Sequence, residues 1–335
     1  MSVTAGSLDG LRARPRETLA DIVRRNGWSL GLVVFLGLLL ILTKIIQPNY
    51  SFVSIQFLAV AVLPLAFAAV AQAIIVIGGG IDLSIASMMA LTSVVSATLM
   101  KGQSAEVGVA VVIGVLILGL FLGAINGTLV VLTRVPDIIV TLATFFVWSG
   151  FALLVLPTPG GSASPWLREL VTGPLLLPFI PKSAVVLLVL VSLIWIPIAR
   201  SRTGLSIYAI GSRKLAAFRS GVPVGRTKII SYTIGGLFAA LGGLALTATT
   251  SIGSPVPEPT YTLISIAAIV LGGVSLAGGV GGVLGPIIAV VVLQLIRTDM
   301  TFLGFDPNLG LVAQGFILIG VLVMGNWIQI RRSRT

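Results

Sequence analysis

Apolar runs about as long as a membrane span follow one another along almost the whole chain. A helix needs about 20 residues to cross a ~30 Å hydrocarbon core. Only 9% of the residues are charged, and backbone in lipid satisfies its own hydrogen bonds as helix. The sequence therefore predicts an all-α polytopic membrane protein, with a transmembrane region at 28–330. About ten transmembrane helices are expected, at 29–46, 55–77, 84–100, 107–133, 136–157, 182–200, 229–250, 262–280, 282–298 and 309–330.

The basic residues gather on alternate connections between these runs. The net charge is +11, and 16 of the 21 Lys and Arg lie before the first run, at Arg134, between 200 and 228, or after residue 330. Cytoplasmic loops of membrane proteins carry such an excess. We therefore expect both termini inside, with 1–27 as a basic cytoplasmic lead-in and 331–335 as a cytoplasmic tail. No basic stripe interleaves with aromatic residues, so we expect the chain to contact a lipid bilayer and to bind no nucleic acid.

A glycine-rich break separates the second and third runs, at Gly78-Gly79-Gly80-Ile81-Asp82-Leu83-Ser84. Each glycine costs about 1 kcal/mol relative to Ala inside a helix, so the backbone is expected to leave the helix here. A charged Asp82 at bilayer depth costs at least ~2.5 kcal/mol, which makes it a functional-site hypothesis. Transporters place substrate sites in such breaks. Two compatible roles stay open for Asp82: lining a substrate path, or capping the helix that follows.

Further polar residues lie inside the fourth and fifth runs. Asn126 either bonds a neighbouring helix or lines the path. Thr141 and Thr144 line the path or bond carbonyls of their own helix. Asp137, at the start of the fifth run, suits the positive end of a helix. The candidate path residues are Asp82, Ser84, Asn126, Thr141 and Thr144.

The glycine break has a weaker counterpart later in the chain. The segment Ile75-Val76-Ile77-Gly78-Gly79 resembles Ile269-Val270-Leu271-Gly272-Gly273. Both segments are expected to join a run entering from outside to one that returns outward. The sequence therefore predicts two loosely repeated halves in the same orientation, an arrangement found in transporters.

The residue types that most catalytic and metal sites need are scarce. The chain has no Cys and no His, and it carries no phosphate-binding loop pattern, zinc motif or pair of carboxylates. We expect no catalytic residue, no metal and no cofactor in this chain. Its energy source is then expected to be a separate protein.

Several segments, in order between about residue 50 and residue 325, resemble one family. That family is the membrane (permease) subunit of bacterial ABC importers for monosaccharides, of the ribose, xylose and autoinducer type. The segments are the glycine break itself, Asn126-Gly127, Arg134-Val135-Pro136, Ile139-Val140-Thr141-Leu142, Tyr208-Ala209-Ile210-Gly211, Ala216-Ala217, Ser220-Gly221-Val222, Ala267-Ala268-Ile269-Val270-Leu271-Gly272-Gly273 and Leu284-Gly285.

The resemblance implies a set of partners. It implies a second permease copy or homologue, a separate ATPase that binds ATP and Mg, a periplasmic sugar-binding protein and a bacterial inner membrane. It also implies a cytoplasmic coupling loop at 201–228 that docks on the ATPase. The coupling residues would be Gly211, Ser212, Arg213, Lys214, Ala216, Ala217, Ser220 and Gly221. The basic Ser212-Arg213-Lys214 departs from the family pattern and would suit an acidic rim, although a merely positive cytoplasmic loop is the alternative.

The sequence favours import of a small neutral polyhydroxylated solute. A neutral sugar needs hydrogen bonds and shape more than counter-ions, and intramembrane charge is scarce here. An ion-coupled secondary transporter is the first alternative, but such carriers need titratable relays in the membrane. An ABC permease for branched-chain amino acids or nucleosides is the second alternative.

Overall fold

The computed structural model describes residues 19–256, 259–306, 309–310, 312, 315–316 and 319–320. Most of the expected run at 309–330, residues 1–18 of the lead-in and the tail at 331–335 lie outside the described residues. Within these ranges the regular structure is helical, apart from two isolated bridges. The helices are α1 (Leu19–Ile46), α2 (Phe52–Ile77), α3 (Ile85–Met100), α4 (Ala105–Thr133), α5 (Asp137–Val155), α6 (Pro165–Val171), α7 (Lys182–Arg200), α8 (Arg202–Ser212), α9 (Lys214–Arg219), α10 (Val224–Thr250), α11 (Pro259–Leu271) and α12 (Leu284–Phe302).

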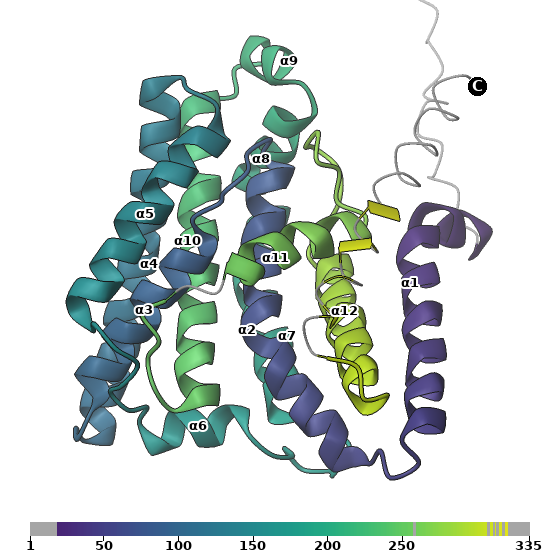
Figure 1. The fold of residues 1–335 in the computed structure, drawn as a ribbon. Coiled ribbons are helices and arrows are strands. Elements are labelled where there is room, and N and C mark those ends of the chain that lie inside the picture. The colour runs from purple at the N-terminus through teal and green to yellow at the C-terminus, as the bar shows by residue number, and fades with distance from the viewer. Residues whose placement is uncertain are drawn as a thin grey trace, which may run out of the picture.

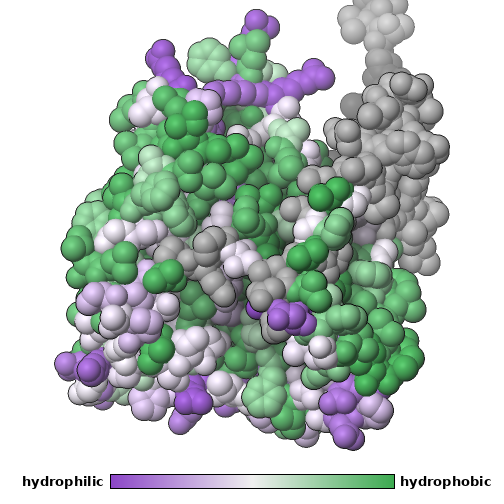
Figure 2. Space-filling view, in the orientation of Figure 1, coloured by the Kyte–Doolittle hydropathy of each residue, from purple (hydrophilic) through white to green (hydrophobic). Residues whose placement is uncertain are grey.

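Six of the described helices are long and apolar enough to cross a membrane: α2, α4, α5, α7, α10 and α12. Shorter apolar helices lie at Leu30–Ile46, Ile85–Met100 and Thr260–Leu271. Hydrophobic side chains cover the flanks of the bundle, and hydrophilic ones gather towards its two ends (Figure 2). The chain is therefore an all-helical, multi-pass membrane protein. The count of ten crossings and the orientation of the termini stay predictions.

The centre of the bundle is formed by α2 and α10, which are buried along most of their length. In Figure 1 they stand between α4 and α5 on one side and α12 and α1 on the other. Helices α4 and α10 pack closest, because glycines face each other. A Cβ added to Gly127 would lie 2.8 Å from the Cα of Ile229, and one added to Gly123 would lie 3.0 Å from the Cα of Gly236. Small residues at such spacing bring helix backbones together in lipid.

The expected span at 262–280 is wrong in its second half. Helix α11 ends at Leu271, so its 13 residues reach about 20 Å, short of a full crossing. The physical reason lies in the glycines that follow. Gly273, Gly278 and Gly279 all have positive φ, between 72° and 87°, a conformation that ends a right-handed helix. The chain runs irregularly from there until α12 begins at Leu284.

Candidate functional site

Asp82 lies at the centre of a buried group of side chains, the Asp82 cluster, formed by Asp82, Ser84, Asn126 and Trp148. Asn126 Nδ2 donates to Asp82 Oδ2 at 3.2 Å and lies 2.7 Å from Ser84 Oγ. Trp148 Nε1 donates to Asn126 Oδ1 at 3.2 Å. The side chains of Asp82, Ser84 and Asn126 are fully buried. The cluster therefore fastens the chain before α3 to α4 and α5.

The hydrogen bonds of Asp82 hold the start of α3. Its Oδ1 accepts from the backbone N–H of Ser84 at 2.7 Å and from Ser84 Oγ at 2.6 Å. A carboxylate bonding the N–H two residues on is an Asx turn, and Ser84 immediately precedes the helix. These contacts are those of a helix-start residue. Solute contact by Asp82 stays a prediction.

The two candidate threonines lie on α5 beside the same break. Thr141 Oγ1 accepts from Leu83 N at 3.1 Å and donates to Asp137 O at 2.9 Å. Thr144 Oγ1 donates to Thr141 O of its own helix at 3.2 Å. All five candidate path residues are thus brought together, on the break and on α4 and α5. Their contact with a solute stays a prediction.

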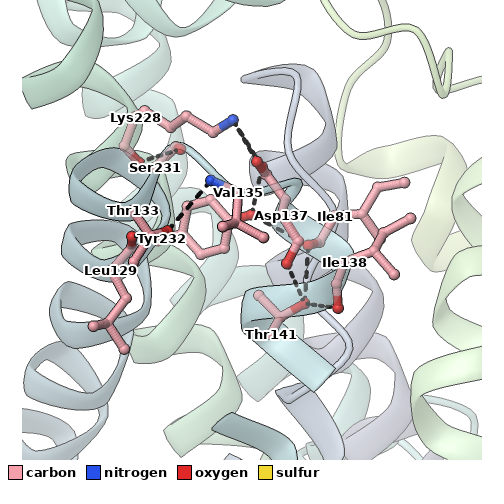
Figure 3. A network of polar contacts seen from close by, with 10 residues as sticks. All are labelled: Ile81, Leu129, Thr133, Val135, Asp137, Ile138, Thr141, Lys228, Ser231 and Tyr232. Atoms are coloured by element: carbon pink, nitrogen blue, oxygen red, sulfur yellow. Dashed lines mark hydrogen bonds and ion pairs between the residues drawn. The ribbon is translucent and has the colours of Figure 1, made fainter. Parts of the chain in front are cut away.

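A second polar group, the Asp137 network, lies one turn away from Thr141 (Figure 3). Lys228 Nζ on α10 lies 2.8 Å from Asp137 Oδ2, and Tyr232 OH donates to the same oxygen at 2.8 Å. Tyr232 OH also lies 3.2 Å from the carbonyl of Ile81. Asp137 is the first residue of α5, as expected, but sequence reasoning missed its partners. The lone cation and phenol near the start of the seventh run were the available signal.

The two glycine breaks meet the loop at 201–228 at one point, the glycine junction, formed by Gly79, Gly211, Gly278 and Gly279. Gly279 N donates to Ile77 O at 2.9 Å. A Cβ added to Gly278 would lie 3.0 Å from both Gly79 Cα and Gly211 O. The backbones touch directly, and a Cβ added at Gly211, Gly278 or Gly279 would lie 3.0 Å or less from a neighbouring backbone atom.

Two side chains of α8 reinforce the glycine junction. Tyr208 OH donates to Gly281 O at 3.0 Å, and Ser212 Oγ lies 3.5 Å from Gly279 O. Burial raises the pKa of the Tyr208 phenol above its ordinary value, so the phenol keeps the proton that it donates. The loop is therefore held to the second break by side-chain hydrogen bonds as well as by backbone contact.

The C-terminal ends of α2 and α11 have the same pattern of backbone hydrogen bonds. Gly79 N donates to Val76 O at 2.9 Å and Gly80 N to Ile75 O at 3.0 Å. The matching bonds run from Gly273 N to Val270 O at 3.0 Å and from Val274 N to Ile269 O at 2.8 Å. Both ends place a glycine with positive φ at the same step, a common way to close a helix. The similarity seen in sequence extends to the local backbone.

Three of the expected coupling residues, Lys214, Ala216 and Ala217, belong to the short helix α9, and the others lie at the ends of α8 and α9. Gly211 and Ser212 close α8, Arg213 precedes α9, and Ser220 follows it. Helix α9 stands at one end of the bundle, away from α6 (Figure 1). Its Leu215 and Phe218 are 63% and 68% exposed, and sequence reasoning did not single them out. Their spacing of three on a helix, among charged residues, was the available signal.

Comparison with known proteins decides the family. The sequence model described as "Branched-chain amino acid transport system / permease component" matches residues 54–322. The chain belongs to this permease family. No solved structure matches the chain significantly.

Among the described residues, no group of three or more His, Cys, Asp or Glu could hold a metal ion.

The curated relatives of this family member include import permeases. The ribose import permease protein of Bacillus subtilis is 33% identical over 320 residues, which cover 93% of this chain and 98% of the relative. The galactose/methyl galactoside import permease protein of Haemophilus influenzae is 29% identical, covering 89% and 93%. The autoinducer 2 import system permease protein of Photorhabdus temperata is 25% identical, covering 94% and 95%. The match thus extends over nearly the full length of each relative.

Proposed function

We propose that the chain is the permease subunit of a bacterial ABC importer for a monosaccharide or a related neutral polyhydroxylated solute. The observation that carries this proposal is the match to the ribose import permease over 98% of that protein. The glycine junction supports it, because it joins the cytoplasmic loop to both breaks of the membrane region. The chain itself has no catalytic role. ATP and Mg are bound by a separate ATPase, and a periplasmic binding protein delivers the solute.

The proposed topology has ten crossings in a bacterial inner membrane, two similarly oriented halves and both termini in the cytoplasm. The shared hydrogen bonds at the ends of α2 and α11 support the repeat. The basic residues of α8, α9 and the start of α10 support a cytoplasmic location for that end of the bundle. A second permease copy or homologue completes the path for the solute.

The proposed ATPase contact is α9 with its flanks. Leu215 and Phe218 would enter an apolar groove on the ATPase. Arg213, Lys214 and Arg219, all exposed around them, would face an acidic rim, because opposite charges steer such encounters. The movement of α9 would reach the breaks through Gly211. Helices α3 and α12 follow the two breaks, so both would shift together.

A neutral solute suits the charges inside the bundle. Asp82 is surrounded by hydrogen-bond donors of its own chain, and Asp137 is paired with Lys228. Neither carboxylate is needed as a counter-ion for a solute. A branched-chain amino acid is the second candidate, favoured by the description of the matching family as a branched-chain amino acid permease component.

Uptake by the reconstituted complex tests the proposal. Proteoliposomes would contain the permease, its ATPase and its binding protein, with labelled D-ribose, D-galactose or L-leucine outside. We expect uptake of a sugar that stops when ATP is omitted or its hydrolysis is blocked, and that survives an ionophore. Uptake that needs an ion gradient but no ATP would establish a secondary transporter instead. Uptake of leucine alone would establish the amino-acid alternative.

A further inference from the structure

A small cavity lies where α2, α11 and α12 meet, apart from the Asp82 cluster and the Asp137 network. Its volume is about 40 Å³. Three apolar side chains and four polar ones line it. The lining residues are Ala61, Leu65, Thr260, Tyr261, Ile264, Gln294 and Arg297.

The lining combines hydrogen-bonding groups with apolar side chains. Gln294 and Arg297 lie three residues apart, so they share one face of α12. The amide offers donors and an acceptor, the guanidinium offers donors only, and the hydroxyl of Thr260 offers both. The hydroxyl groups of a sugar need both kinds of partner. The apolar lining and the ring of Tyr261 suit its C–H surface, a combination typical of small-molecule pockets.

A second observation on α2 points to the same region. Gln72 is fully buried, and neither its Oε1 nor its Nε2 has a hydrogen-bond partner among the described residues. It lies seven residues, or about two turns and 10 Å, beyond Leu65 on the same side of α2. A buried amide without partners is destabilising, because it has lost its hydrogen bonds to water. Such a group in a native protein calls for an explanation, such as a water or another molecule that reaches it.

We propose that this cavity is the outer part of a solute-binding path, which takes a neutral polyhydroxylated solute and continues along α2 to Gln72. This inference rests on the proposed function and names the residues that contact the solute. Gln294 and Arg297 bond its hydroxyls, Tyr261 packs against its C–H face, and Gln72 is the next polar contact inward.

The size of the cavity makes the described conformation a closed one. A water needs roughly 10–15 Å³ of such volume, so 40 Å³ holds a few waters and no sugar. Entry of the solute therefore requires α11 or α12 to move. Helix α11 ends at Leu271, just before Gly272 and Gly273, and the loop that follows packs on Gly211 at the glycine junction. Movement of the cytoplasmic loop is thus connected to the helix that lines the cavity.

The lack of cysteine in the chain permits a direct accessibility test. Gln294→Cys would be introduced into the complex in proteoliposomes and treated with a water-soluble maleimide. We expect labelling that D-ribose or D-galactose slows at least fivefold. The control is Leu193→Cys on α7, which is 69% exposed on an apolar flank and stays unlabelled in lipid. Labelling of Gln294→Cys that neither sugar slows, or no labelling at all, overturns the proposal.

Two substitutions test the path by transport. Gln294→Ala should lower ATP-dependent sugar uptake about tenfold, whereas Gln56→Ala, on the outer turn of α2, should leave it unchanged. Gln72→Leu should raise the melting temperature, because it removes an unpartnered amide, and yet slow uptake several-fold. If Gln72 had only a structural role, its substitution would not raise the melting temperature while slowing uptake.

The outcomes separate the two proposals. ATP-dependent sugar uptake that is the same in Gln294→Ala, Gln72→Leu and Gln56→Ala would overturn the path and leave the proposed function standing. Uptake by the unmodified complex that does not depend on ATP would overturn the proposed function. The labelling experiment does not depend on hydrolysis and still tests whether a sugar reaches α12.

Discussion

The side chains of Asp137 and Lys228 lie 2.8 Å apart and join the first residue of α5 to the beginning of α10. Both are largely buried, at 16% and 15% exposure. Tyr232 adds a third contact from α10 and ties the pair to the carbonyl of Ile81. One ion pair thus connects two helices and the first glycine break.

Lys228→Met should destabilise the protein, because it leaves the Asp137 carboxylate partly buried without its cation. We expect a loss of roughly 2 kcal/mol, measured as a lower melting temperature in detergent. The double variant Asp137→Asn/Lys228→Met should recover part of the loss, since no unpaired charge remains. Lys101→Met, exposed at the opposite end of the bundle, is the control. Equal effects of Lys228→Met and Lys101→Met would show that the pair contributes nothing.

Asp82→Asn should reduce the amount of folded protein. The new amide would place a donor against Asn126 Nδ2, where Asp82 Oδ2 now accepts at 3.2 Å. Turning Asn126 would relieve this contact and break its bond with Trp148. The measurement is the yield and melting temperature of the purified complex.

The exchange Asp82→Asn/Asn126→Asp is the matched test of that cluster. It restores a donor on one side and an acceptor on the other, and the new carboxylate still accepts from Trp148. We expect most of the stability to return. If the exchange recovers stability but not uptake, the carboxylate at position 82 has a role in transport beyond holding α3.

Gly211→Ala should uncouple ATP hydrolysis from uptake. The added Cβ would clash with Ile77 O at the first break and lie about 2.5 Å from Gly279 N at the second, which forces the loop away from both breaks. The exposed side of α9 is unchanged, so the ATPase should still co-purify while uptake falls at least tenfold. Gly114→Ala on α4 has open space around it and serves as the control. Normal uptake in Gly211→Ala would exclude the junction from coupling.

Reversing the charge of Arg213 and Lys214 to Glu should weaken ATPase binding about tenfold, or about 1.4 kcal/mol. The loss should shrink at high salt, because exposed charges are screened. Leu215→Ser/Phe218→Ser should weaken binding at every salt concentration. Co-purification of the ATPase measures both, with Lys101→Glu as the control. Binding that withstands all four changes would place the ATPase contact elsewhere.

Much of the helical framework could be predicted from the sequence, because long apolar runs in lipid have few alternatives to a helix. The departure from helix at Gly78–Gly80 followed from the glycines themselves. The end of α11 at Leu271 could not be predicted in this way. The apolar run continues past Leu271, and the helix ends there because the later glycines adopt positive φ angles. The sequence after Leu271 is both apolar and rich in glycine, so it is compatible with a helix and with an irregular loop.

The contacts that assemble the candidate site could not be predicted. Asp137 and Lys228 are 91 residues apart, and no local pattern relates them. The approach of Gly211 to Gly279 likewise depends on how the end of α8 packs against the two glycine breaks. Sequence reasoning identified Asp82, Ser84 and Asn126 singly, but their union depends on the packing of α3 against α4.

The glycine junction has a consequence for how such a permease changes its cargo. Its surfaces are peptide backbone, so it carries no side-chain chemistry that substitution could adapt to a new solute. Changes of selectivity must then accumulate elsewhere, in the helices beyond it. We therefore expect the proposed transmission of movement through this junction to be the same whichever solute is carried.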